Sequence, residues 1–94
     1  DGVLVCGSSG EAALLDEGER VRCVALAREA VPGDRWLLAG VGGESTRQTA
    51  RRAREAAAHG ADLVLVVAPH YFGTRMDARA LHAHFTAVAD ASPV

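Results

Sequence analysis

The feature that most constrains the fold is a pattern that occurs three times: a short apolar run that ends abruptly in glycine, serine or proline. The runs cover Val3–Cys6, Trp36–Val41 and Asp62–Ala68. Apolar, β-branched runs of this length are typical of buried strands, and helix-length segments lie between them, as parallel neighbours require. The pattern therefore predicts a βαβαβα order with a parallel sheet. Its three loops should be neighbours at the carboxyl edge, where α/β folds carry their sites.

The intervening segments carry helix start and stop signals. Capping-box spacings at Asp16–Glu19 and Ser45–Gln48 predict two helix starts. These helices should end at about Ala30 and at His59, where proline or glycine follows. Asp77 is expected to cap a third helix.

At 94 residues, the chain has room for one small domain or for part of a larger one. An open doubly wound sheet and a closed (β/α)8 barrel both fit the pattern. A barrel typically needs ~250 residues, so on that interpretation the chain supplies about three of eight units. Residues 91–94 break the last helix and resemble the start of another strand. We expect residues 1–94 to be one partial domain, incomplete at both ends.

Composition excludes several classes of function. The formal net charge of −2 is too small to favour nucleic acid or an anionic membrane. No apolar run approaches the ~20 residues that span a bilayer. Cys6 and Cys23 lack metal-site spacing and are expected to be free thiols in a reducing compartment. All ten basic side chains are arginine, so the chain contains no lysine.

Two glycine-containing loops invite other interpretations. Gly40-x-Gly42-Gly43 begins like a dinucleotide-binding fingerprint, but Ser45 stands at the third glycine position and no acidic residue ends the next run. Gly7-Ser8-Ser9-Gly10 resembles a nucleophile elbow whose second glycine comes one position early. Two hydroxyls with loop N–H groups suit the binding of a carboxylate better.

The loop after the third run contains His70 and Tyr71. A phenol in this place can pass a proton or hydrogen-bond a substrate, although packing of the ring over the sheet edge is the simpler interpretation. His82 and His84 are two apart on a helix and make no metal pair. The arginines of residues 47–55 are interpreted as a solvated helix face rather than a phosphate site, because alanines at helical spacing supply the packing face.

Several motifs in a fixed order resemble the dihydrodipicolinate synthase / N-acetylneuraminate lyase family across the whole chain. They are Gly7-Ser8-Ser9-Gly10-Glu11, Ala39-Gly40-Val41-Gly42, Ser45-Thr46, Gly60-Ala61-Asp62 and Val67-Ala68-Pro69-His70-Tyr71. Three further segments look most like 4-hydroxy-2-oxoglutarate aldolase within that family: Glu44-Ser45-Thr46, Gly73-Thr74-Arg75-Met76 and Val88–Pro93.

This resemblance implies a (β/α)8 barrel and a class I aldolase or lyase that needs no metal or other cofactor. In that family, a lysine on a later strand forms a Schiff base with pyruvate or another 2-oxo acid, and an aldehyde is the second partner. Ser8 and Ser9 would bind the pyruvyl carboxylate, and Ser8 would also assist the proton relay. Tyr71 would join the relay, in many members from across a subunit interface, and Glu11 would be structural. A cytoplasmic dimer or tetramer is implied, or a mitochondrial one in a eukaryote.

Two departures from the family pattern leave an alternative open. His70 and Phe72 replace residues that are often aromatic and polar, respectively, in synthase members, and residues 1–94 contain no lysine. A family member that binds a 2-oxo acid without turnover, as a sensor or regulator, would share the same loops. A lysine on a later strand would favour the enzyme, and its replacement would favour the binder.

Overall fold

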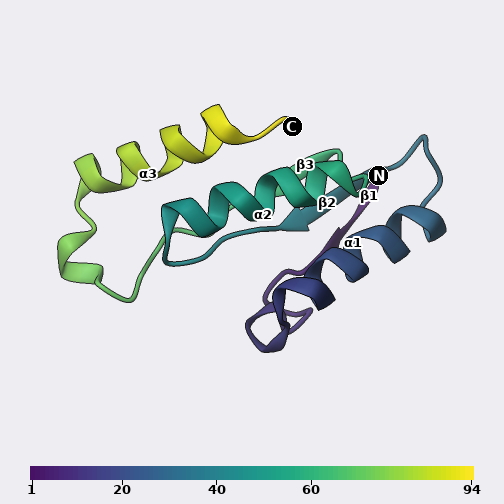
Figure 1. The fold of residues 1–94 in the computed structure, drawn as a ribbon, viewed down its shortest axis with the longest axis horizontal. Coiled ribbons are helices and arrows are strands. Elements are labelled where there is room, and N and C mark those ends of the chain that lie inside the picture. Colours follow the sequence, from purple (N-terminus) through teal and green to yellow (C-terminus); the bar gives the residue numbers. More distant parts are fainter.

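A computed structural model describes residues 1–94 and contains three parallel strands that alternate with three helices (Figure 1). The strands are β1 (Gly2–Val5), β2 (Trp36–Gly40) and β3 (Leu63–Leu65). The helices are α1 (Glu17–Ala30), α2 (Thr46–Ala58) and α3 (Ala78–Ala91), with short 3₁₀ turns at Ala12–Leu14 and Gly73–Arg75. The predicted element order is thus confirmed.

Each helix begins immediately after the capping residue that the sequence predicted for it. Asp16 and Glu19 form a complete capping box, with Glu19 N–H donating to Asp16 Oδ1 at 2.8 Å and Asp16 N–H donating to Glu19 Oε2 at 2.9 Å. Asp77 Oδ1 accepts from the backbone of Ala80 at 2.8 Å. Only half of the second box forms, because the Gln48 side chain turns away to Glu17. None of the three helices combines the length and apolar character that a membrane crossing requires.

The strands pair in the order β1-β2-β3, so their carboxyl ends lie at one edge of the sheet. Val3 is opposite Leu37, and Leu38 is opposite Leu63. Strand β3 is shorter than the predicted run: its last contact across the sheet is the carbonyl of Leu65, which accepts from Val41 N–H at 3.0 Å. The reason is that β2 ends at its glycine-rich loop and leaves residues 66–68 without a partner. Residues 92–94 form no strand, contrary to expectation.

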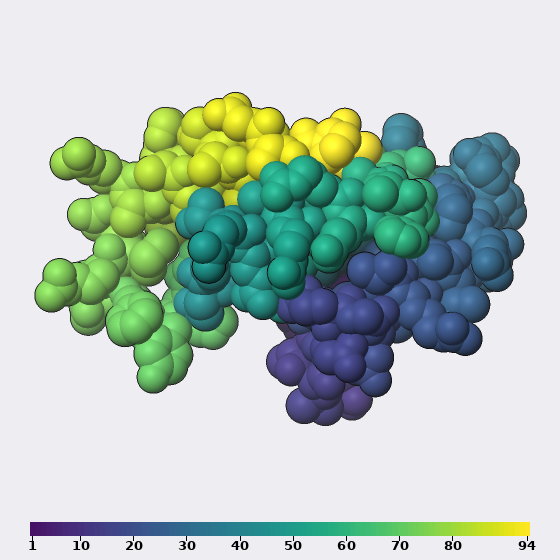
Figure 2. Space-filling model, in the orientation of Figure 1, coloured from purple at the N-terminus to yellow at the C-terminus, as the bar shows by residue number.

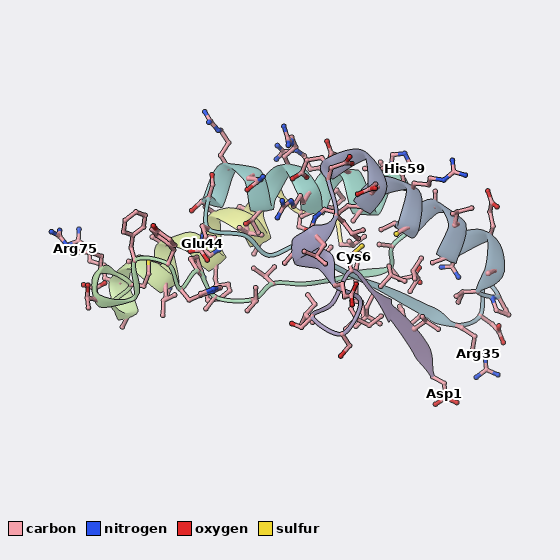
Figure 3. The ribbon with its side chains drawn as sticks, turned by 90° about the horizontal axis from the view of Figure 1, so that it is seen from below. Asp1, Cys6, Arg35, Glu44, His59 and Arg75 are labelled. Carbon is pink, nitrogen blue, oxygen red and sulfur yellow. The ribbon has the colours of Figure 1, made fainter.

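The core lies between the sheet and helices α1 and α2, which cover the same face of the sheet, and α3 packs against α2 (Figure 3). Residues at alternate positions of β2 and just beyond it point toward α1 and α2. The buried cluster is Val24, Leu37, Ala39, Val41, Ala53, Ala56 and Ala61. Burial of Leu37 alone stabilises the fold by roughly 1.5–3 kcal/mol. The alanines of α2 form the packing face that the sequence predicted.

A carboxylate at the amino edge joins three elements. Asp62, immediately before β3, accepts from the backbone N–H of Leu37 at 2.8 Å and from Arg28 of α1 at 2.9 Å. The pKa of Asp62 lies below its usual value, first because of the Leu37 N–H and then because of Arg28. This contact fixes the start of β3 relative to β2.

The opposite face of the sheet is apolar and uncovered within this chain. It presents five large side chains that are 43% to 60% exposed: Leu4, Trp36, Leu63, Leu65 and Val67. In a closed barrel this face is the packed interior. The burial that the apolar runs predicted for the strands is therefore found only on the helix side of the sheet.

Candidate active site

The loop after β1 is a tight turn that presents two serines. Cys6 and Glu11, at its two ends, have φ angles of 55° and 52°, which are uncommon for residues other than glycine. Inside the turn, Glu11 N–H donates to Ser8 O at 3.0 Å. Ser8 and Ser9 are exposed, and neither hydroxyl has a hydrogen-bond partner within the chain. The turn therefore leaves two donors available at the carboxyl end of β1.

Helix α1 and strand β2 hold this turn in place. The guanidinium of Arg20 donates to the carbonyls of Ala12 and Gly40. Gly40 lies so close to the turn that a Cβ atom there would be 2.0 Å from the carbonyl oxygen of Cys6. Only glycine fits this approach, so the position of the serine turn depends on β2.

The two cysteines are free thiols, as predicted. Cys6 is buried beneath the turn, and its Sγ atom lies 3.9 Å from the carbonyl oxygen of Arg20. Burial raises the pKa of the Cys6 thiol, so the group is a neutral thiol rather than a nucleophilic thiolate.

Arg52 of helix α2 departs from the solvated-face prediction. Its side chain is only 13% exposed. Arg52 Nε donates to both carboxylate oxygens of Glu17, at 3.1 and 2.9 Å, and Nη1 donates to the carbonyl of Gly42 at 2.9 Å. The hydrogen bond from Arg52 holds the pKa of Glu17 below its usual value. The other arginines of this helix face, at 47, 51 and 54, are exposed as predicted.

The segment after β3 carries Tyr71 away from the sheet. Residues 66–70 have no regular secondary structure, and the chain extends to one end of the molecule (Figures 1 and 2). The Tyr71 ring is 77% exposed and packs edge-on against Phe72, with ring centroids 4.9 Å apart. Packing of this ring over the sheet edge, the simpler interpretation of the sequence, is wrong. No hydrogen bond joins the phenol to Ser8 or Ser9.

Glu44, between β2 and α2, contacts the backbone that carries Tyr71 (Figure 3). Its Oε2 atom accepts from the N–H groups of His70 at 3.0 Å and Tyr71 at 2.9 Å. The His70 Nδ1 atom lies 3.2 Å from Oε1. The Tyr71 N–H is the largest cause of a Glu44 pKa below the usual value, followed by the His70 N–H. From the sequence, Glu44 stands out only as part of the Glu44-Ser45-Thr46 motif and as an acidic residue in the loop after β2, and neither feature predicts a contact with the Tyr71 backbone.

His84 ties α3 to the start of α2. It is 4% exposed, and its Nδ1 lies 2.8 Å from Thr46 Oγ1. Val88, one helical turn further along α3, is also buried. No group of three or more metal-ligating side chains comes together in the chain.

Comparisons with known proteins agree on one family. The model of the dihydrodipicolinate synthetase family matches residues 1–94. A 4-hydroxy-tetrahydrodipicolinate synthase from Synechococcus sp. (strain CC9605) is 43% identical over 93 residues, covering 99% of this chain and 30% of the relative. The "Probable 4-hydroxy-2-oxoglutarate aldolase, mitochondrial" of Emericella nidulans is 41% identical over 97 residues, covering 99% of this chain and 31% of the relative.

Solved structures give the same result. A prophage protein of the dihydrodipicolinic acid synthase family from E. coli K12, determined in complex with pyruvate, superposes with a TM-score of 0.91 and 31% identity. The superposition covers 100% of this chain and 31% of that protein. The chain thus spans about 30% of the length of the proteins it matches. Its three βα units are a portion of a (β/α)8 barrel.

Proposed function

The chain belongs to the dihydrodipicolinate synthetase family, and on this premise we propose that it is part of a class I aldolase. The full-length protein would form or cleave a carbon–carbon bond next to pyruvate held as a Schiff base. The observation that carries the proposal is the serine turn at the end of β1, in a chain that superposes on a pyruvate-bound relative.

Ser8 and Ser9 are proposed to bind the carboxylate of pyruvate. Both hydroxyls are unpartnered donors at the carboxyl edge of the sheet, and a carboxylate offers acceptors for both. A hydrogen bond to a charged group contributes about 1.5–3 kcal/mol. Glu11 is proposed to be structural, because its backbone closes the turn and adopts the required positive φ.

The Schiff-base lysine would come from outside residues 1–94, which contain no lysine. Its amine would add to the pyruvate carbonyl with loss of water, giving an iminium. The iminium would accept the electron pair of a methyl C–H bond as that proton leaves, and the resulting enamine would form the new carbon–carbon bond to the aldehyde carbonyl, whose oxygen takes up a proton. Cleavage follows the same steps in reverse. The protons that these steps transfer would pass through the Tyr71 phenol with the assistance of Ser8. The exposed position of Tyr71 suits a phenol that reaches the site of a second subunit, so a homodimer or homotetramer is proposed.

The second substrate is proposed to be an aldehyde, as in a 4-hydroxy-2-oxoglutarate aldolase or a dihydrodipicolinate synthase. Residues that would select the aldehyde lie mostly outside this segment. We propose a cytoplasmic location, or a mitochondrial one if the source is eukaryotic, since one relative is named as mitochondrial.

Trapping of the imine tests the proposal. The full-length protein is incubated with pyruvate and reduced with borohydride, and its intact mass is then measured by mass spectrometry. A sample lacking pyruvate is the control. A mass gain of one reduced pyruvyl group per subunit is expected. Pyruvate binding without an adduct would instead identify a non-catalytic sensor or regulator, and absence of both would refute any 2-oxo-acid site.

A further inference from the structure

The segment between β3 and α3 has few backbone contacts of its own. The N–H groups of His70 and Tyr71 donate to no backbone carbonyl. Residues 66–70 belong to no helix or strand, and the side chains of residues 70–72 are exposed. The first backbone hydrogen bond after β3 in this segment is from Arg75 N–H to Phe72 O, beyond the tyrosine. The position of Tyr71 must therefore be set by contacts from another part of the chain.

Glu44 supplies those contacts. One carboxylate oxygen, Oε2, accepts from two successive N–H groups, those of His70 and Tyr71, at 3.0 and 2.9 Å. Successive N–H groups that converge on one anion form a favourable anion-binding arrangement. Glu44 is fixed in turn, because Ser45, the next residue, is the N-cap of α2. This carboxylate thus joins the end of β2 to the Tyr71 backbone across 27 residues of sequence.

We infer that Glu44 is a positioning residue, which acts through the backbone of His70 and Tyr71 to hold the Tyr71 phenol where it transfers a proton. The inference rests on the proposed function, since it assigns Tyr71 to the proton relay. Glu44 touches no substrate on this account. Its contribution is to confine an otherwise exposed segment to one conformation.

The inference makes a specific kinetic prediction for the full-length protein. Glu44→Ala removes the acceptor of both N–H groups, so kcat should fall at least about ten-fold, as expected when a general acid–base group is displaced. The KM for pyruvate should change much less, because Ser8 and Ser9 remain in place. Glu44→Gln keeps one oxygen that can accept from both N–H groups and should restore most of kcat. Glu29→Ala, an exposed carboxylate on α1, is the matched control and should match the wild type.

A double mutant separates positioning from a general loss of structure. If Glu44 acts through Tyr71, Tyr71→Phe combined with Glu44→Ala should be no slower than Tyr71→Phe alone. If the double mutant instead loses kcat by the product of the two single-mutant factors, the inference is overturned. An unchanged kcat in Glu44→Ala would also overturn it.

Thermal unfolding and the pyruvate adduct are measured for each variant. If Glu44→Ala does not fold, failure of Glu44→Gln to retain kcat while it folds normally would overturn the inference. Absence of an adduct in the wild type would refute the proposed function instead.

Discussion

At the scale of single residues, the proposed binding of the pyruvate carboxylate depends on Ser8 and Ser9, whose hydroxyls have no hydrogen-bond partner in the chain. Ser9→Ala removes one donor for a carboxylate but leaves the backbone turn intact, because Glu11 N–H still donates to the carbonyl of Ser8. We expect kcat/KM of the full-length protein to fall by the equivalent of roughly 1–3 kcal/mol. Steady-state kinetics with pyruvate as the varied substrate provides the measurement.

Thr86→Ala is the control for the serine substitution, because Thr86 is an exposed hydroxyl on α3 far along the chain from the turn. It should leave kcat/KM unchanged. An unaltered kcat/KM in Ser9→Ala, and again in Ser8→Ala, would remove the carboxylate-binding role from this turn.

At the scale of elements, Asp62 joins β3 to β2 and α1, and its lowered pKa makes this contact pH-dependent. A carboxyl whose folded pKa is below its unfolded value of about 3.9 stabilises the fold above that value. The stabilisation is lost as the pH falls through the folded pKa. Asp62→Asn should therefore lower the urea midpoint of the full-length protein near pH 7, and its difference from the wild type should shrink below about pH 4.

The matched control for Asp62→Asn is Asp90→Asn, an exposed carboxylate on α3. It should show no comparable loss near pH 7. A difference between Asp62→Asn and the wild type that stays constant from pH 7 to pH 3 would show that the carboxylate charge does not contribute.

At the scale of the whole molecule, residues 1–94 leave one sheet face uncovered. Five large apolar side chains are exposed there, and β1 and β3 each have an unpaired edge. Such a face and such edges favour self-association. We expect the isolated segment to aggregate or to behave as a molten globule. A monomeric segment with a sharp, cooperative thermal transition would contradict this expectation.

What the sequence could predict depended on whether the determining contacts were local. The starts at Asp16 and Asp77 were predictable because a cap bonds to a residue three positions along. The contacts of Glu44 with the His70 and Tyr71 backbone and the contact of Arg52 with Glu17 were not, because their partners are 26 to 35 residues away and come close only in the folded sheet. The serine turn was recognised from its glycines, but the support from Gly40 required the β1–β2 register. The direction of the Tyr71 ring has no local signal.

The most direct test of the central claim is a crystal structure of the full-length protein trapped with pyruvate and borohydride. The account predicts a reduced pyruvyl group on a lysine from outside residues 1–94, with its carboxylate within hydrogen-bonding distance of the Ser8 or Ser9 hydroxyl. A trapped carboxylate held by other residues, with the serine turn facing solvent, would contradict it.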